Sequence, residues 1–449
     1  MRKDLHGLSL STDSTEAGDA FDRATMAYLK YRTDAGRHLG AALKADPDFA
    51  LGYVLRGYFN MLAYNTANLQ GATDSLAEAR KRSSRMNTRE VAHTEALAKW
   101  IEGDLDRMLE IWEGIIAEHP HDVMAFRLHH FNAFWLGRPG QMQAEVEKVY
   151  PHWSADYPGW AMLLGCRCFA HEESGNYTLA ESAGRMALEV DPGDLWGAHA
   201  IAHVLEMQGR RGEGIEWLKR LEANWEGANN LKHHLHWHRA MFHIERREFD
   251  EVLKQYDKGF RDMGSPLTQA MPDMYIDVQN AASMLFRLER HGVDVGDRWV
   301  ELADKAEARI GDCLSAFTLP HWMMALAATG RTDAAKRMIE AMRAFGQGNT
   351  TVSRLVGRIA LPICEAVLAH RQGKHQAVLS HMRPIISDMY LLGGSHAQQD
   401  VLEQLFLDSA LKAESAEDVR LMLERVAGRH PVPPARRVGY AAAAARYAH

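Results

Sequence analysis

Small and apolar residues in this chain recur at the spacing of one helix face. Within residues 175–192, Ala180, Ala183 and Ala187 stand three or four positions apart, and small side chains at this spacing let a second helix approach closely. Runs that alternate apolar and polar residues, which are typical of half-buried strands, are absent from the sequence. The pattern therefore predicts an all-α protein.

The expected helices are grouped in a repeating unit. Turn residues between paired helices recur at Gly103, Gly137, Gly175 and Gly209, which are 34, 38 and 34 positions apart. Later turns are expected, in order along the chain, at Arg247, Gly292, Gly330 and Gly373. Prolines that end helices occur in the pairs Asp46-Pro47, His119-Pro120 and Asp191-Pro192.

Each unit is predicted to be a hairpin of two helices whose apolar face only a neighbouring hairpin can bury. The period of about 34 residues is that of the tetratricopeptide repeat. We expect a tetratricopeptide-type α-solenoid, a single superhelical domain over residues 21–428 without a separate catalytic domain. Residues 1–20 are expected to form a lead-in. Residues 429–449 are expected to form a Pro/Ala-rich tail, whose prolines end the last repeat helix.

Composition excludes several classes of protein. The 449 residues include 52 Lys+Arg and 59 Asp+Glu, so the formal net charge is −7, and a mildly acidic chain is a poor nucleic-acid binder. No apolar run reaches the roughly 18 residues that indicate a membrane span, and the polar N-terminal segment has no secretory signal. Four cysteines are too few for a disulfide framework. We therefore expect a cytoplasmic protein with reduced, mostly buried thiols.

The 24 histidines are unevenly distributed. Two second helices of hairpins, residues 177–190 and 211–225, contain none, although His381 on a later second helix is an exception. In a tetratricopeptide solenoid the first helices line the concave face, so histidines on them are expected in the groove. The first helices of successive hairpins carry His129, His130, His171, His199, His203, His233, His234, His236, His238, His243 and His321.

Two neighbouring first helices share one register of histidine and glutamate. Residues 198–209 place His199, His203 and Glu206 at i, i+4 and i+7, which is one helix face. In residues 234–245, His234 and His238 are again at i, i+4, and Glu245 lies seven positions beyond His238, which is the spacing of His199 and Glu206. We expect these imidazoles and carboxylates to converge in one groove.

This set of side chains fits two kinds of site and one structural role. A transition metal binds neutral imidazoles together with carboxylates. Histidine oriented by glutamate also forms a general acid–base pair. The third interpretation is that the histidines only form hydrogen bonds that order the groove. The sequence leaves these three open, and it contains no H-E-x-x-H motif, Walker loop or G-x-S-x-G elbow.

Further groove candidates lie on the other expected first helices. Arg127 and Arg167 are suited either to clamp a carboxylate or phosphate of a ligand or to pair with Glu173 or another acidic residue of the chain. Ser395 is expected to cap the helix that starts after it, with His396 and Asp400 at i, i+4 in its first turns. The remaining candidates are Trp135, Trp160, Tyr275, Asp277, Asn280, Arg287 and Trp322.

Four segments resemble the tetratricopeptide repeat protein 38 family over residues 20–425. They read HAIAHVLEMQGR, HLHWHRAMFHIE, DVQNAASMLFRL and SHAQQDVLEQ. Leu235 stands where the family pattern has Asn. The resemblance implies the solenoid fold and a site, without a settled activity. The site residues that it implies are His199, His203, Glu206, His234, Trp237, His238, Asp277, Ser395, His396 and Asp400.

Two functions follow as hypotheses. In the first, a closed pocket binds a small molecule and hydrolyses it or catalyses an elimination, with His203 or His238 as base and Glu206 and Glu245 orienting them. A transition metal on this cluster is compatible with that chemistry, but the sequence identifies no cofactor. The residues expected to contact the substrate are His199, His234, Trp237, Arg127, Asp277, His396 and Asp400.

The second hypothesis is a scaffold that binds a peptide or protein partner in its groove. A structural homo-oligomer is a third alternative. The sequence does not decide the oligomeric state or the substrate, and it predicts neither a nucleic-acid partner nor a membrane.

Overall fold

The computed structural model describes residues 2–447, and its regular elements are helices. Within that range, extended pairing is limited to two isolated bridges, Lys3 with Ser9 and Arg32 with Ala228. The prediction of an all-α protein is confirmed. No helix in residues 2–447 combines the length and the apolar character needed to cross a membrane.

The helices belong to two compact units. The first unit comprises the chain up to Ile201, with Ala223–Leu231 and Thr350–Val352. The second comprises Ala202–Glu222, Lys232–Asn349 and the chain from Ser353 onward. The sequence pattern does not indicate this division, because the turn series continues through it without a break.

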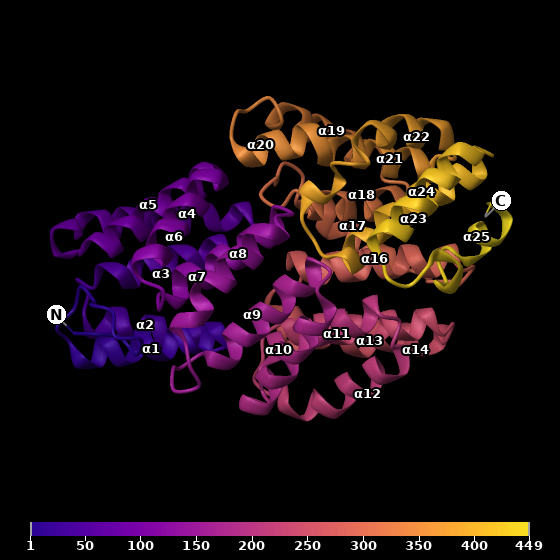
Figure 1. Ribbon diagram of the computed structural model, residues 1–449. Coiled ribbons are helices and arrows are strands. Elements are labelled where there is room, and N and C mark those ends of the chain that lie inside the picture. The colour runs from indigo at the N-terminus through magenta and orange to yellow at the C-terminus, as the bar shows by residue number, and fades with distance from the viewer. Residues whose placement is uncertain (1, 448–449) are drawn as a thin grey trace. The chain divides into compact units, whose positions relative to one another are not determined.

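The first unit is built from consecutive helices that pack in pairs, such as α1 on α2, α3 on α4, α5 on α6 and α9 on α10. Short 3₁₀ turns, η1 (Thr66–Asn68), η2 (Ser83–Arg85) and η3 (Tyr150–His152), join some of them. Its helices (Figure 1) are α1 (Thr15–Leu29), α2 (Ala35–Ala45), α3 (Ala50–Met61), α4 (Leu69–Lys81), α5 (Thr88–Glu102), α6 (Leu105–Glu118), α7 (Val123–Trp135), α8 (Pro139–Val149), α9 (Trp160–Glu173), α10 (Tyr177–Val190) and the first half of α11 (Leu195–Met207).

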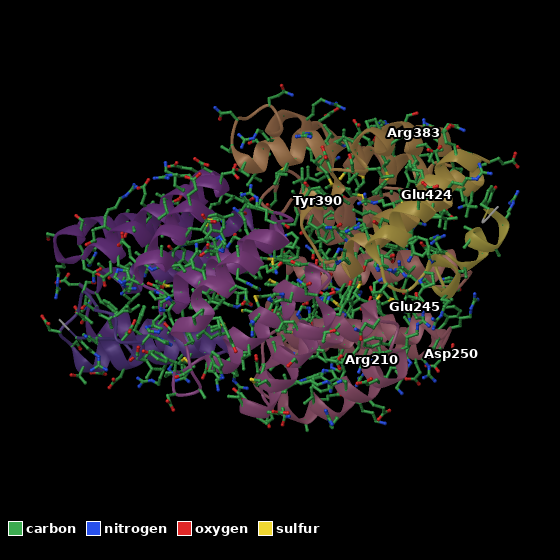
Figure 2. The ribbon with its side chains drawn as sticks, in the orientation of Figure 1. Arg210, Glu245, Asp250, Arg383, Tyr390 and Glu424 are labelled. Carbon is green, nitrogen blue, oxygen red and sulfur yellow. The ribbon has the colours of Figure 1, made fainter. Side chains whose placement is uncertain are left out.

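The second unit takes the rest of α11 and the helices that follow it, again packed in pairs such as α17 on α18, α21 on α22 and α23 on α24. Charged residues such as Asp250, Arg383 and Glu424 are exposed on it (Figure 2). Its helices are α12 (Arg211–Leu221), α13 (Leu231–Glu245), α14 (Phe249–Gln255), α15 (Pro266–Ala270), α16 (Tyr275–Arg290), α17 (Arg298–Ala308), α18 (Thr318–Ala328), α19 (Thr332–Phe345), α20 (Thr351–Leu355), α21 (Leu361–Arg371), α22 (His375–Met382), α23 (His396–Lys412), α24 (Ala416–Arg429) and α25 (Ala441–Tyr447).

Irregular turns interrupt or extend some of these helices. Two π-helical turns, η5 (Tyr256–Phe260) and η6 (Val356–Ala360), adjoin α14 and α21. The remaining 3₁₀ turns are η4 (Glu222–Asn224), η7 (Arg383–Ile385), η8 (Met389–Leu392) and η9 (Pro434–Arg436).

The turn register predicted from the sequence is confirmed. Every turn residue of the series has a positive φ, from 59° at Arg247 to 82° at Gly175. This left-handed conformation is open to glycine at no steric cost, and it ends a helix by satisfying its last carbonyl groups. The glycines of this series therefore mark the turns between the first and second helices of the hairpins.

Arg247 is the one member of this turn series that is not glycine. A side chain in the left-handed region costs about 1–2 kcal/mol, so Arg247→Gly is expected to raise the free energy of unfolding by about 0.5–1 kcal/mol. Gly175→Ala, where a Cβ would meet no neighbour, is expected to lower it by about 1 kcal/mol through backbone strain alone. Urea denaturation of the two variants measures both. A change of the same sign in both variants would contradict this explanation.

The two ends of the chain are more ordered than their composition suggests. The first helix begins at Thr15, within the segment expected to be a lead-in, and Ser14 caps it. In the tail, the side chains of Val432 and Tyr440 are buried and residues 441–447 are helical. The tail therefore belongs to the packed second unit. All four cysteines are buried thiols, as expected.

Candidate metal centre

Three buried histidines of the second unit converge. His203 comes from α11, and His234 and His238 come from successive turns of one face of α13. Their exposed fractions are 1%, 2% and 0%. Each offers a ring nitrogen, and these nitrogens lie within 4.8 Å of one another. The ring of His238 is central, with its centroid 4.4 Å from that of His203 and 4.7 Å from that of His234.

The other ring nitrogen of two of these histidines is held by a hydrogen bond. His238 Nδ1 donates to Glu206 Oε2 at 3.0 Å, and His234 Nδ1 donates to Asn280 Oδ1 of α16 at 2.9 Å. The ring of Trp237 stacks on His234 at 5.1 Å with 9° between the planes. Histidines that bind metals usually donate their second ring N–H in this way, which fixes the tautomer and leaves Nε2 as the ligand atom.

The three imidazoles are neutral at pH 7. Burial lowers the pKa of His238 to about 3. Burial also lowers the pKa of His203 and of His234 well below 6.5, and the neighbouring histidines lower both further. A metal ion binds the neutral form of imidazole, so protons do not compete for this cluster near neutral pH.

His199 lies one turn before His203 on the same face of α11. Its residue belongs to the first unit, where it is buried and its ring packs against Trp196 and Phe169 at 4.7 and 5.4 Å.

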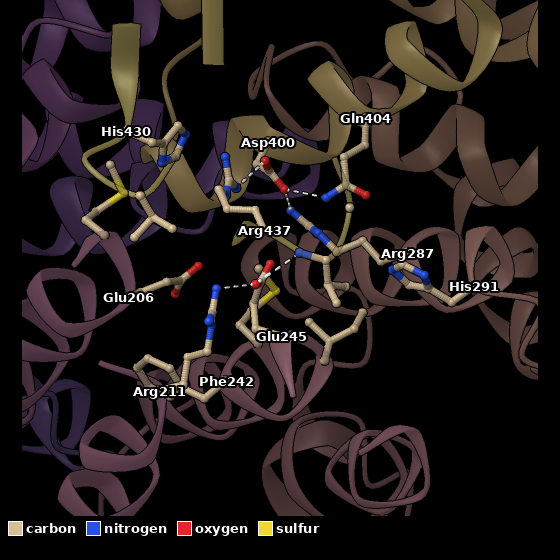
Figure 3. Close-up of a pocket in the computed structure, with 16 residues that line it drawn as sticks. Glu206, Arg211, Phe242, Glu245, Arg287, His291, Asp400, Gln404, His430 and Arg437 are labelled. Atoms are coloured by element: carbon tan, nitrogen blue, oxygen red, sulfur yellow. Dashed lines mark hydrogen bonds and ion pairs between the residues drawn. The ribbon is translucent and has the colours of Figure 1, made fainter. Parts of the chain in front are cut away.

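Glu206 connects the histidines with a cavity. Besides binding His238, it lines a cavity of the second unit (Figure 3). Burial raises the pKa of Glu206 to about 8, although the positive charges of Arg287 and Arg437 lower it in part. The carboxyl group is therefore largely protonated at pH 7 in the metal-free protein.

The cavity is small and its lining is strongly charged. Its volume is about 30 Å³, which is room for one or two water molecules. Besides Glu206, the residues that line it are Met207, Arg211, Met241, Phe242, Ile244, Glu245, Arg287, His291, Asp400, Gln404, His430, Val432, Arg437, Val438 and Gly439.

Asp400 is the main hydrogen-bond acceptor of the cavity wall. It accepts from Arg437 Nη2 at 2.6 Å, Tyr440 OH at 2.7 Å, Gln404 Nε2 at 2.7 Å and Arg287 Nη2 at 3.3 Å. The two guanidinium groups hold the pKa of the Asp400 carboxyl below its usual range despite burial. The predicted i, i+4 spacing places Asp400 at the cavity. The ring of His396 lies 5.9 Å from that of His430, and burial with nearby arginines lowers the pKa of His396 to about 3.

Glu245, expected to orient a histidine, has other partners. Its carboxylate accepts from Arg211 Nη2 at 2.7 Å and from the backbone N–H of Val438 at 3.2 Å. Burial raises its pKa. Through these two hydrogen bonds Glu245 links the C-terminal tail to α12 at the cavity wall (Figure 3).

A second group of metal-ligating residue types is already neutralised by arginines. Asp400, Glu403 and His430 bring ligand atoms within 4.8 Å of one another. Glu403, however, accepts from Arg425 at 3.0 Å and pairs with Arg429, and Asp400 is paired as above. The arginines already compensate the negative charges of these carboxylates, so the group attracts a cation only weakly.

Two further residues predicted from the sequence lie elsewhere. Asp277 accepts from His233 Nδ1 at 3.0 Å, and His233 is not part of the cluster of three histidines. Arg127 belongs to the first unit, where it binds Tyr31. Ser395 caps α23, with reciprocal hydrogen bonds to Gln398, as predicted.

The residues of the C-terminal tail that line the cavity were not predicted from the sequence. Arg437 and Tyr440 bind Asp400 from the C-terminal tail, and Arg211 is the first residue of α12. No period marks these positions. The sequence signal at these positions is the pair Arg436-Arg437 in the Pro/Ala-rich tail. A comparison with models of known protein families finds no match to this chain.

Proposed function

We propose that the second unit is a metal-dependent hydrolase that holds a divalent transition metal, in the simplest case Zn²⁺, on a ring nitrogen of His203 and on Nε2 of His234 and His238. The observation that carries this proposal is the convergence of three buried, neutral imidazoles, two of which donate Nδ1–H to Glu206 and Asn280. We further propose that the hairpins stack as tetratricopeptide repeats and that the chain is a member of the tetratricopeptide repeat protein 38 family.

Within the second unit three histidines can bind the ion, which is the number of protein ligands in catalytic zinc centres. Structural zinc sites use four protein ligands, whereas catalytic sites use three and bind water in the fourth position. The ion would supply a water acidic enough to attack a substrate near neutral pH. Glu206 is placed to orient His238 on one side and to face a bound substrate on the other.

The charges of the cavity select the substrate. The guanidinium groups of Arg211, Arg287 and Arg437 outnumber the carboxylates of Glu245 and Asp400, and Glu206 is largely neutral at pH 7. An anionic group of the substrate is therefore favoured beside Glu206. A cavity of about 30 Å³ is too small for an organic molecule, so tail residues 432–439 must move for substrate to enter.

Metal content of the purified chain tests the proposal. We expect about one zinc per chain after equilibration with Zn²⁺, and a loss of at least about tenfold in affinity in His203→Gln and His238→Gln. His321→Gln is the matched control, because His321 is equally buried but bonds only to the carbonyl of Phe317. Equal zinc content in all four proteins would refute the site.

His199→Ala separates a catalytic from a structural site. If a water completes the coordination, this variant keeps its zinc, as the hydrolase proposal requires. Loss of zinc in His199→Ala would make His199 the fourth ligand of a closed structural site.

The pH dependence of zinc affinity follows from the pKa shifts. Burial holds the pKa of His203, His234 and His238 well below 6.5, so these histidines release no protons when they bind the metal near pH 7. Glu206, with its pKa of about 8, releases one proton. We therefore expect the logarithm of the affinity to fall by no more than about one unit per pH unit. Competition with a chromophoric chelator measures it. A fall approaching three units per pH unit below pH 6.5 would show ordinary, solvated histidines instead.

A further inference from the structure

Arg127 of α7 is a buried cation without a carboxylate partner. It is 2% exposed, and its one hydrogen bond runs from Nη2 to the hydroxyl of Tyr31. Its Nη1 has no hydrogen-bond partner among residues 2–447, and no ion pair to it is found within that range. Arginine keeps its charge at any accessible pH, so this charge is buried in the first unit without an ion-pair partner among the described residues.

Aromatic rings compensate this charge only in part. The guanidinium carbon lies 4.4 Å from the ring centroid of Trp196 and 5.5 Å from that of Tyr31. Tyr31 and Trp196 in turn stack at 5.9 Å with 18° between their planes. A cation over an aromatic face gains less than the cost of removing an unpaired charge from water. The arrangement therefore fits a protein that holds an anion at this position.

His130 supplies a second donor beside Arg127. It stands three residues later on α7, on the same helix face, and is 1% exposed. Neither ring nitrogen has a partner among the described residues, and its ring meets Trp196 edge-on at 6.3 Å. Burial and the charge of Arg127 lower the pKa of His130 well below 6.5. The neutral ring has one N–H to donate.

Asp194 is an acidic group whose charge interacts with that of Arg127, although no ion pair joins the two among residues 2–447. Burial raises the pKa of Asp194 to about 6, and Arg127 lowers it in part. Asp194 Oδ1 accepts from the backbone N–H of Trp196 at 3.1 Å, at the start of α11. Cys166, also close to Arg127, is a neutral thiol because burial raises its pKa to about 12. Neither group forms a hydrogen bond or an ion pair with the guanidinium among the described residues.

A cavity of the first unit is lined by residues that are close in the chain to this cluster. Its volume is about 400 Å³, and much of its lining is apolar, including Met26, Leu29 and Met162. Lys30 and Asp194, which also line it, are next to Tyr31 and two residues before Trp196 in the chain. The cavity is large enough for a small organic molecule.

We propose that the first unit binds a small monocarboxylate, whose carboxylate is held by Arg127 Nη1–H and an N–H of His130 against Trp196. One guanidinium balances one negative charge, and its planar donors match a carboxylate. The apolar body of the ligand occupies the cavity lined by Met26, Leu29 and Met162. This site is independent of the histidine cluster of the second unit.

Calorimetric titration of the full chain with sodium butyrate and sodium benzoate tests the site, with sodium chloride and inorganic phosphate at matched ionic strength as comparison anions. We expect saturable, one-to-one binding of a monocarboxylate and a loss of at least about tenfold in affinity in Arg127→Met and His130→Leu. Arg167→Met is the control, because Arg167 is paired with Glu147 at 2.6 Å on α9 and α8. It should bind the monocarboxylate as the unchanged chain does.

Stability without ligand gives an independent readout. Removing an unpaired buried charge should not destabilise the protein, so Arg127→Met should unfold in ligand-free buffer at a temperature no lower than the unchanged chain. Arg167→Met, which breaks an ion pair, should unfold at a lower one. No saturable monocarboxylate binding by the unchanged chain, or equal binding of chloride and phosphate, would overturn the proposal. Failure of Arg127→Met to fold would also count against it, since the cation would then be structural.

Discussion

Asp400→Asn is expected to lower the free energy of unfolding by about 3–5 kcal/mol. Asp400 is 1% exposed and pairs with Arg287 and Arg437, which are themselves largely buried. Asparagine keeps the shape but removes the charge, which leaves two buried guanidinium groups uncompensated. Guanidinium chloride denaturation measures the loss.

The control for this prediction is Asp333→Asn. The Asp333 side chain is 90% exposed, so its change should stay within about 0.5 kcal/mol. Arg437 and Arg287 hold the pKa of Asp400 below its ordinary 3.8 in the folded protein. The ionised carboxylate therefore makes its full contribution to the free energy of unfolding above about pH 4, and this contribution is lost as the pH falls further. An Asp400→Asn protein as stable as the Asp333→Asn protein would contradict the pairing.

Chelation of the bound metal is expected to lower the free energy of unfolding by about 4 kcal/mol, relative to protein in free Zn²⁺ at about a thousand times its Kd. An ion on the proposed site would bind the folded histidine cluster and not the unfolded chain, so its occupancy would shift the equilibrium toward the folded state. Thermal denaturation with Zn²⁺ and with EDTA measures the difference.

His238→Gln is the matched variant for chelation. It removes the central ring of the cluster, and its stability should be the same in Zn²⁺ and in EDTA. A zinc-dependent gain in His238→Gln as large as in the unchanged chain would place the ion elsewhere.

The sequence predicted the local features of the fold well. The turns from Gly103 to Gly373 need a residue in the left-handed conformation. Glycine adopts this conformation without steric cost, so the glycines in the sequence mark the turns. The cap of α23 at Ser395 is equally local. Such features depend on a few neighbouring residues, and a single sequence contains all of them.

The candidate site was predicted in part. The i, i+4 spacing of His234 and His238 places both on one face of α13, and Glu206 binds His238 as an orienting group would. The same reasoning assigned Glu245 to a histidine, but its partners are Arg211 and Val438. Helix register gives the face from which a side chain projects, whereas its partner depends on which segment packs there.

The tail could not be assigned from the sequence. Arg437 and Tyr440 reach Asp400 from about forty residues away in the chain, and no repeat or motif signals a contact of that separation. The division into two units is likewise a property of packing. Both features depend on tertiary contacts that neither periodicity nor propensity records.

X-ray absorption spectroscopy of the zinc-loaded chain tests the central claim most directly. The account predicts three imidazole nitrogens at about 2.0–2.1 Å and a further light atom from water, with the imidazole scattering reduced in His238→Gln. A first shell made only of carboxylate and water oxygens, unchanged in that variant, would contradict a metal centre on His203, His234 and His238.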